Sequence, residues 1–555
     1  MQAHRRAALI VLVFTLTLTL AAPVAAQAPA AASPASTKQT CAIDQRSPSD
    51  ADDYLYHRNF AEADRLYTAA LAADPASFQA MAGIVRATLG QDKLADALTL
   101  ATQYDAAHPH NPILLDALGE VRFRRGEVDE AATAFNESLH LDLCNGITHY
   151  DMYRFLNLSG MFATAQRRLD MAHTLAPNNQ RIKQLWHASH EAPMTDEETL
   201  AMLKNFLDSP SATTEEKEGT QAAIAAIQAR ERGDCQLVSP VTDAKVPIVP
   251  IGFGAVMSPQ EMYAAGLDVL FNGKRKRLEI DTGASGIIIS RAVAKSAGLV
   301  PELQTTASGV GDKGPSATFV THVDDIRIGA MEFKNCMVHV LEQTNLLENV
   351  DGLIGPDVFR NFVVTLDIPG RELRLGPLPP RPGDAAAQPT SLSTAGDTLR
   401  QTRADQARDR YIAPEMKDWE PIFRWEHFLI FPTVIGNAPL KLFMMDTGAS
   451  QGMISPAAAR EVTHVSGDSS THVKGFSGEV KSVLIADKVS ITFARVRQIT
   501  DGMLSYDNTM LARTTGVEIS GLIGFPTLRE LIISIDYRDN LVHVVYDPKH
   551  GFHTH

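Results

Sequence analysis

The sequence predicts a multidomain chain in which an all-α repeat array precedes two similar all-β lobes. Three observations predict this order. The length of 555 residues is that of about three to four domains. Alanines recur at one constant interval in the first part of the chain, at Ala63, Ala97, Ala131 and Ala165. The second part carries two Asp-Thr-Gly triplets in matching surroundings, beginning at Asp281 and at Asp446.

Composition and charge exclude several classes of function. Apolar residues make up 45% and charged residues 21% of the chain, as in ordinary globular proteins. The net charge of −14 argues against a nucleic-acid partner and against a polybasic membrane-binding surface. The cysteines are too few and too scattered for a zinc ribbon, and no histidine stands at metal-ligand spacing. We therefore expect no metal and no organic cofactor.

The N-terminus predicts export. Arg5 and Arg6 precede an apolar run over residues 7–22, and Val24-Ala25-Ala26 supplies the small residues of a cleavage site. The run is short for a bilayer span, which favours a cleaved signal peptide over residues 1–26 rather than an uncleaved anchor. An Ala/Pro/Ser-rich spacer follows over residues 27–47. We expect a periplasmic or secreted mature protein without a membrane span.

Residues 48–235 are predicted to form the helical domain. Positions four and seven residues after each repeat alanine share one helical face. Prolines that would end the helices stand at Pro75, Pro109 and Pro177, and glycines suited to the turns at Gly126 and Gly160. After the repeats, Thr195 and Glu198 form a capping box that predicts a further helix, and residues 214–230 predict another.

The 34-residue period resembles the tetratricopeptide repeat over about residues 50–180. That resemblance implies helix pairs stacked into a solenoid, whose concave face would bind a peptide or a protein partner. Leu143 stands where proline is expected, and the leading helix of the first repeat is weakly marked, so the count is about three to four repeats. A plain helical bundle is the alternative.

The chain from about residue 246 is rich in Val, Ile, Thr and Gly, which predicts short strands and turns. We place one lobe at residues 246–380, a Pro/Ala-rich linker at 381–410 and a second lobe at 411–548. Later landmarks are separated by nearly the same offset as the two triplets. Gly352-Leu353-Ile354-Gly355 matches Gly521-Leu522-Ile523-Gly524, and the strand ending at Asp367 matches the strand ending at Asp536.

The paired triplets and their flanks resemble bacterial retropepsin-like and pepsin-like aspartic peptidases, and are nearer to the retropepsin-like branch. The resemblance covers about residues 246–380 and 411–548, and it implies that Asp281 and Asp446 form a catalytic dyad. Two facing carboxyl groups cannot comfortably both ionise, so they share one proton. The ionised member can then activate a water molecule, while the protonated member donates to the peptide carbonyl oxygen.

The resemblance also assigns roles to the neighbours of the dyad. It implies that the hydroxyls of Thr282 and Thr447 interlock the two loops, and that Gly283 and Gly448 allow the backbone to turn beside the carboxyl groups. It further implies that two apolar-glycine elements form the strands behind the dyad: Leu353, Ile354 and Gly355 in the first lobe, and Leu522, Ile523 and Gly524 in the second.

Each lobe also carries a glycine-rich hairpin between these landmarks. Gly309-Val310-Gly311 and Gly475-Phe476-Ser477-Gly478 resemble flaps that close over a bound peptide, with Phe476 as an apolar tip. Ordinary surface hairpins are the alternative. Ala284 and Ala449 follow the triplets where pepsin-like chains carry a hydroxyl that stabilises the ionised acid. We therefore expect a dyad that works nearer to neutral pH than that of pepsin.

A linker of roughly thirty residues allows the two lobes to pair within one chain, although pairing of each lobe with its copy in a symmetric dimer is the alternative. The sequence thus predicts an exported aspartic endopeptidase that acts on a peptide or protein substrate, with repeats for a protein partner or for the substrate. The competing hypothesis is a non-catalytic periplasmic scaffold with protease-like lobes. Two complete triplets favour catalysis, because a binding protein has no physical need for facing carboxyl groups.

Overall fold

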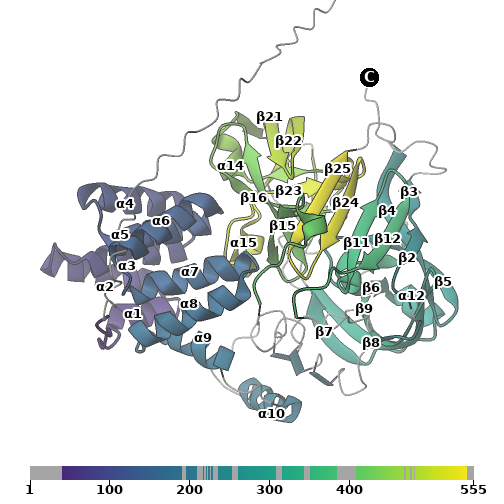
Figure 1. Ribbon diagram of the computed structural model, residues 1–555, viewed down its shortest axis with the longest axis horizontal. Coiled ribbons are helices and arrows are strands. Elements are labelled where there is room, and N and C mark those ends of the chain that lie inside the picture. Colours follow the sequence, from purple (N-terminus) through teal and green to yellow (C-terminus); the bar gives the residue numbers. More distant parts are fainter. Residues whose placement is uncertain are drawn as a thin grey trace, which may run out of the picture. The chain divides into compact units, whose positions relative to one another are not determined.

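The structure, a computed structural model, describes most of the chain from residue 41 onward. The described residues are 41–190, 195–208, 217, 220–221, 223–224, 227–228, 235–239, 241–252, 261–307, 316–342, 350–383, 408–467, 471–475, 478–480 and 482–546. The predicted signal peptide and most of the predicted spacer and linker lie outside them. Helices occupy the first part and two β lobes the second, which confirms the predicted fold class (Figure 1).

The helical part consists of successive helix pairs. Its helices are α1 (Asp50–Tyr56), α2 (Phe60–Ala73), α3 (Phe78–Gly90), α4 (Leu94–Ala107), α5 (Pro112–Arg124), α6 (Val128–Leu141), α7 (Gly146–Leu158), α8 (Phe162–Leu175), α9 (Gln180–His190) and α10 (Asp196–Leu207). Helices α3, α5, α7 and α9 begin at a constant interval, in step with the alanine period. Ala63, Ala97, Ala131 and Ala165 are at most 1% exposed, because close helix approach leaves room only for small side chains there.

The turn inside each helix pair holds one residue in the left-handed region. Gly126 and Gly160 have φ values of 69° and 75°, and Arg58 and Asp92 adopt 62° and 59° at the same repeat position. Glycine takes this conformation without steric cost, whereas the other two residues carry a Cβ penalty. The turn geometry therefore belongs to the repeat and is kept even where the sequence lacks glycine.

The capping box predicted at Thr195 is also present. Its hydroxyl accepts a hydrogen bond from the amide of Glu198, and the Glu198 carboxylate accepts from the Thr195 amide, at the start of α10. The following predicted helix, over residues 214–230, is described only in part. No helix in the described part of the chain is both long and apolar enough to span a bilayer.

Lobe 1 is built mainly from antiparallel strands. Its elements are β1 (Gln236–Leu237), β2 (Ala244–Pro247), β3 (Val249–Gly252), β4 (Met262–Phe271), β5 (Lys274–Ile280), β6 (Ile287–Ser290), α12 (Arg291–Ser296), β7 (Leu303–Ala307), β8 (Ser316–Ile328), β9 (Met331–Leu341), β10 (Gly352–Ile354), η2 (Pro356–Phe359), β11 (Phe362–Asp367) and β12 (Glu372–Pro377). The main sheet has the order β1-β9-β6-β10-β5-β4-β8-β7, with β3 paired to β4.

Lobe 1 begins before residue 246, where the sequence places its start. Strand β1 pairs with β9, and the neighbouring Cys235 forms a disulfide with Cys336 of β9. So short a strand gives no alternating pattern, and only the tertiary pairing reveals it. No cysteine among the described residues is a free thiol.

Lobe 2 repeats the plan of lobe 1. Its elements are η3 (Pro414–Met416), β13 (Glu420–Pro421), β14 (Phe423–Trp425), β15 (Phe428–Ile435), β16 (Lys441–Asp446), β17 (Met453–Ile454), α14 (Pro456–Arg460), β18 (Val465–Gly467), β19 (Lys474–Gly475), β20 (Gly478–Glu479), β21 (Leu484–Phe493), β22 (Val496–Ser505), α15 (Thr509–Thr515), β23 (Gly521–Gly524), α16 (Phe525–Leu528), β24 (Leu531–Asp536) and β25 (Leu541–Tyr546). The main sheet has the order β14-β15-β16-β23-β17-β22-β21-β18.

A six-stranded sheet joins the two lobes within one chain. Its order is β13-β25-β24-β11-β12-β2, so strands of both lobes contribute to it. At its centre β11 runs antiparallel to β24, and Thr365 lies opposite Ser534 with their hydroxyl oxygens 2.8 Å apart. These residues occupy equivalent positions in the two lobes. The lobes are therefore related by an approximate two-fold axis that passes between them.

The helical array and lobe 2 share a hydrophobic core. Phe123, Val128 and Phe135 of the helices cluster with Ile430 and Leu442 of lobe 2. Beside this cluster, the Lys441 ammonium donates to Glu127 over 2.8 Å, and both side chains are at most 3% exposed. Because Lys441 opens β16 and Asp446 closes it, the same strand contacts the helices and ends at the second triplet.

Candidate active site

Each triplet lies at the C-terminal end of a central strand of its sheet. Asp281 comes just after β5, and Asp446 is the last residue of β16. Strand β10 runs parallel to β5 and pairs Ile354 with Ile280, and β23 pairs Ile523 with Met445 in the same way. The amide of Asp281 donates to the carbonyl of Ile354 over 3.0 Å. The two apolar-glycine elements, Leu353, Ile354 and Gly355 and Leu522, Ile523 and Gly524, thus lie alongside the strands that carry the aspartates.

The threonines of the two triplets hold the loops together through four reciprocal hydrogen bonds. The Thr282 amide donates to the Thr447 hydroxyl oxygen over 2.9 Å, and the Thr447 amide donates to the Thr282 hydroxyl oxygen over 3.0 Å. Each hydroxyl then donates into the opposite lobe, Thr282 to the Met445 carbonyl and Thr447 to the Ile280 carbonyl. Both side chains are 1% exposed, so this network fixes the two aspartates relative to each other.

The glycines of the triplets leave room for the opposing carboxyl groups. A Cβ placed on Gly448 would lie 2.6 Å from the Asp281 Cγ, and one placed on Gly283 would lie 3.0 Å from the Asp446 Oδ1. The two carboxyl groups also act on each other electrostatically, because the charge of Asp446 raises the pKa of Asp281. The structure therefore brings Asp281 and Asp446 together from separate lobes of one chain, each against the glycine of the opposite triplet.

The two carboxyl groups differ in their backbone donors. Asp281 Oδ1 accepts from the Gly283 amide at 2.8 Å, whereas Asp446 Oδ1 accepts from the amides of both Gly448 and Ala449 at 3.0 Å. Backbone donors stabilise the ionised form of a carboxyl group. The geometry therefore favours negative charge on Asp446 and the shared proton on Asp281.

The pKa values follow the same asymmetry. Burial, and then the charge of Asp446, raises the pKa of Asp281 to about 7, against the opposing effects of the Gly283 amide and His427. Burial also raises the pKa of Asp446, where the Gly448 and Ala449 amides oppose it. The near-neutral working pH expected from Ala284 and Ala449 stays a prediction, because the raised pKa of Asp281 is caused by burial and by the charge of Asp446.

Sequence reasoning missed two ionisable neighbours of the dyad. His427, in the turn between β14 and β15, places its Nε2 3.3 Å from the Gly283 carbonyl oxygen in the other lobe. Glu279, in β5, stands two residues before Asp281, and its own pKa is raised by burial and by the charges of both aspartates. The period of two in a strand places Glu279 on the same face as Asp281, so the sequence did hold a signal for this residue.

Sequence reasoning also missed an acid that orders the first loop. The Ser285 hydroxyl donates to Asp357 Oδ2 over 2.9 Å, and the Gly286 amide donates to Asp357 Oδ1 over 3.1 Å. The corresponding residue of lobe 2 is Pro526, which has no carboxylate. The two loops are thus supported by different means.

The predicted flaps are described only in part. Gly475 and Gly478 pair across the turn between β19 and β20, which places a hairpin at this point of lobe 2. Phe476 and the corresponding residues of lobe 1, Gly309, Val310 and Gly311, lie outside the described residues. Within the part of the chain that is described, no group of three or more His, Cys, Asp or Glu side chains is arranged to hold a metal ion.

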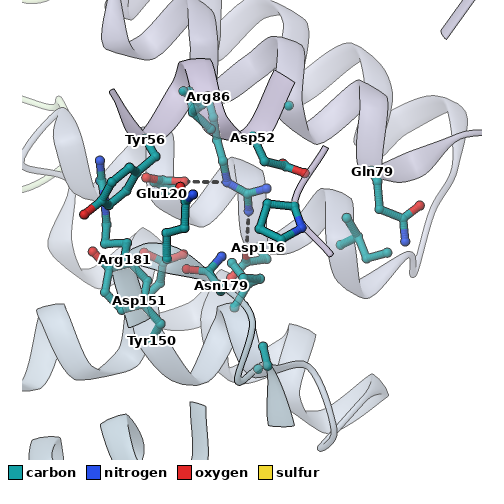
Figure 2. A pocket seen from close by; sticks show the side chains of 18 of the residues that line it. Asp52, Tyr56, Gln79, Arg86, Asp116, Glu120, Tyr150, Asp151, Asn179 and Arg181 are labelled. Carbon is teal, nitrogen blue, oxygen red and sulfur yellow. Dashed lines mark hydrogen bonds and ion pairs between the residues drawn. The ribbon is translucent and has the colours of Figure 1, made fainter. Parts of the chain in front are cut away.

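The helical array carries a separate, charged cavity of about 940 Å³ (Figure 2). Successive repeats line it with alternating charges at one equivalent position, Asp52, Arg86, Glu120 and Arg154. Arg86 pairs with Glu120 at 2.9 Å, and Arg154 pairs with Glu120 at 3.2 Å. Arg86 also binds Asp116, and Arg154 binds Asp151. These ion pairs connect consecutive repeats along the cavity.

Comparison with known proteins agrees with the geometry of the β lobes. Residues 267–358 match a family model described as "Aspartyl protease". The match begins in β4, ends in η2 and contains the first triplet together with Leu353, Ile354 and Gly355. No curated protein matches the chain. The part of lobe 1 that carries Asp281 is therefore similar to an aspartyl protease domain.

Proposed function

We propose that the protein is an exported aspartic endopeptidase that hydrolyses peptide bonds with Asp281, Asp446 and a water molecule. The observation that supports this proposal most directly is the close approach of the two aspartates from separate lobes, each against the glycine of the opposite triplet. A binding surface would gain nothing from two acids in contact, because each raises the cost of ionising the other. An acid pair that shares a proton is instead what general acid-base catalysis requires.

The different environments of the two carboxyl groups suggest their roles. Asp446, with two backbone donors, starts ionised and takes a proton from the attacking water. Asp281 starts protonated and donates its proton to the peptide carbonyl oxygen as the C–O bond to water forms. Asp446 then passes its proton to the amide nitrogen, the C–N bond breaks, and Asp281 recovers its proton from the tetrahedral intermediate. The dyad ends in its starting state.

We further propose that the helical array supports lobe 2 and binds a polypeptide, either substrate or partner. The shared hydrophobic core and the buried Lys441–Glu127 pair support the first role. The charged cavity supports the second, because its lining offers hydrogen-bonding groups to the backbone and side chains of a bound chain. No cofactor enters this mechanism, and the substrate is a peptide or protein.

The decisive experiment incubates the purified mature protein with a diverse peptide mixture between pH 3 and 8, beside Asp281→Asn and Asp446→Asn variants. We expect cleavage by the parent and none by either variant, because one dyad needs both acids. Asp418→Asn is the matched control, since Asp418 is exposed and outside the site, and it should cleave normally. Retained cleavage in either dyad variant would point to separate sites in paired copies of the chain. A parent that binds peptides without cleaving any would favour the scaffold hypothesis.

A further inference from the structure

Glu279 lies in β5, two residues before Asp281, which directly follows the strand. Its neighbours Leu278 and Ile280 are 0% and 3% exposed and belong to the core of the lobe. Because side chains alternate along a strand, Glu279 points to the opposite face, and it is only half-buried. The side chain of Glu279 therefore lies on the face that leads to the dyad.

Two apolar side chains continue this face across the sheet. Leu353 of β10 lies opposite Glu279, and Ile288 of β6 lies opposite Leu353. Residues directly opposite each other in neighbouring strands project to the same side. Like Glu279, both are half-buried, so solvent reaches all three. The three residues form a row, called here the acidic row, with a carboxyl group at one end and an aliphatic surface beside it.

The corresponding row of lobe 2 contains no charge. Met444 takes the position of Glu279, Leu522 that of Leu353 and Met453 that of Ile288, and these three residues keep the same register. All are buried, at 4%, 4% and 1% exposed. The two halves of the site thus differ in chemistry at one position that lies two residues before each aspartate.

No cation of the described chain neutralises Glu279. Arg277, two residues earlier on the same face, instead donates to Asp268 over 3.0 Å. The residue opposite Glu279 in β4 is Gly266, which carries no side chain. Burial, and then the charges of the two dyad acids, raises the pKa of Glu279 to about 8. A positive charge brought next to Glu279 would relieve this excess of acid groups.

We propose that Glu279 is a specificity residue that binds a lysine or arginine side chain of the substrate on one side of the scissile bond. Such a side chain fits the whole acidic row. Its aliphatic stem packs on Leu353 and Ile288, and its cationic head donates to the Glu279 carboxylate in a charge-assisted hydrogen bond. Lobe 2, with Met444 in the equivalent place, offers no such partner. This inference rests on the proposed peptidase function.

The test compares peptides that differ only by lysine or norleucine at successive positions around the cleaved bond. For the parent we expect kcat/KM to be about tenfold to a hundredfold higher with lysine at one of these positions, the range of a charge-assisted hydrogen bond. In Glu279→Gln, which keeps the shape of the side chain, the ratio of kcat/KM between lysine and norleucine peptides should fall to about one. Glu415→Gln, a surface change of equal charge, should keep the preference.

Two outcomes would overturn the inference. The first is a parent protein that shows no preference for lysine at any position of the peptide. The second is a Glu279→Gln variant that cleaves lysine and norleucine peptides more slowly by the same factor, because Glu279 would then act only on the dyad. A binding measurement tests the role of Glu279 separately from the proposed peptidase function. Reduced-amide peptides with lysine or norleucine cannot be cleaved, so a lysine preference in binding that Glu279→Gln removes would support the inference even if the parent cleaves nothing. That result would reject the proposed function alone.

Discussion

Thr282 and Thr447 exchange hydrogen bonds between the two lobes, each amide donating to the other hydroxyl oxygen. Each hydroxyl is at once an acceptor and a donor, so neither can be lost without leaving a buried group unpaired. The position of the dyad thus depends on both lobes equally.

Replacing either hydroxyl should therefore affect stability and activity together. Thr282→Val keeps the shape of the side chain but leaves the Thr447 amide and the Met445 carbonyl without partners. We expect a loss of about 1–3 kcal/mol in the free energy of unfolding, measured by urea denaturation, and a clear loss of peptidase activity. Thr282→Ser, which keeps the hydroxyl, is the control and should retain most of both. Equal behaviour of the two variants would mean that the hydroxyl network does not hold the site.

Activity should depend on pH through the shared proton. With the pKa of Asp281 near 7, the proton needed on this residue is lost as the pH rises through neutrality, so peptidase activity should fall there. Activity should also fall in acid, once Asp446 takes up a proton. A pH profile of kcat/KM checks both limbs. A profile that stays flat from pH 6 to pH 9 would contradict the assignment of the proton to Asp281.

Stability should respond to the same group in a defined direction. The folded protein holds the Asp281 proton more tightly than the unfolded chain, whose Asp pKa is about 3.9. Folding is therefore favoured by this group at low pH, and its contribution is lost as the pH rises from about 4 to about 7. Thermal denaturation across this window should show Asp281→Asn gaining stability relative to the parent as the pH increases. A constant difference in Tm would refute the elevated pKa.

His427 should influence the alkaline limb. His427 lies next to the Gly283 carbonyl and lowers the pKa of Asp281, against the larger effects of burial and Asp446. Replacing it with the neutral His427→Gln should therefore let Asp281 keep its proton to higher pH and move the alkaline limb of the kcat/KM profile upward. The exposed His464 offers a comparison, because His464→Gln should leave the limb in place. A downward shift in His427→Gln would contradict the electrostatic effect.

The buried ion pair between Lys441 and Glu127 should stabilise the folded state of both the helical array and lobe 2. Lys441→Met removes the partner of a carboxylate that is 3% exposed, and breaking such a pair costs about 3–5 kcal/mol. Glu127 keeps its ion pair with Arg125, which limits the loss. We expect a lower midpoint of urea unfolding, partly restored in the double variant with Glu127→Leu. Lys488→Met, an exposed lysine on β21, should leave the midpoint unchanged.

The fold class was predictable because its signals are short patterns that repeat. The spacing of Ala63, Ala97 and the later alanines reports helix packing that recurs in each repeat, and the triplets at Asp281 and Asp446 report a duplicated lobe. Such patterns survive in the sequence because each copy meets the same local constraints. The two apolar-glycine elements also lie beside the aspartates in the structure, since their register follows the strands that carry them.

Features that depend on single long-range contacts left no pattern in the sequence. His427 meets Gly283 of the other lobe, and Lys441 of lobe 2 meets Glu127 of the helical array. One histidine or one lysine in a sequence has many ordinary explanations, and only the folded chain shows its partner. The short strand β1 was missed for a similar reason, because its position depends on β9 and on the disulfide between Cys235 and Cys336.

The covalent linkage of two related lobes, joined through β11 and β24, has one more consequence. A site made from two identical subunits looks the same from either end, so a ligand can enter it in two equivalent orientations. Here Met444 takes the place of Glu279 in the second lobe, and Pro526 takes the place of Asp357, so the two halves of the site are unlike. Under the proposed function, a polypeptide bound in this site would meet different surroundings when its N- and C-terminal directions are reversed, so the two directions would not be equivalent.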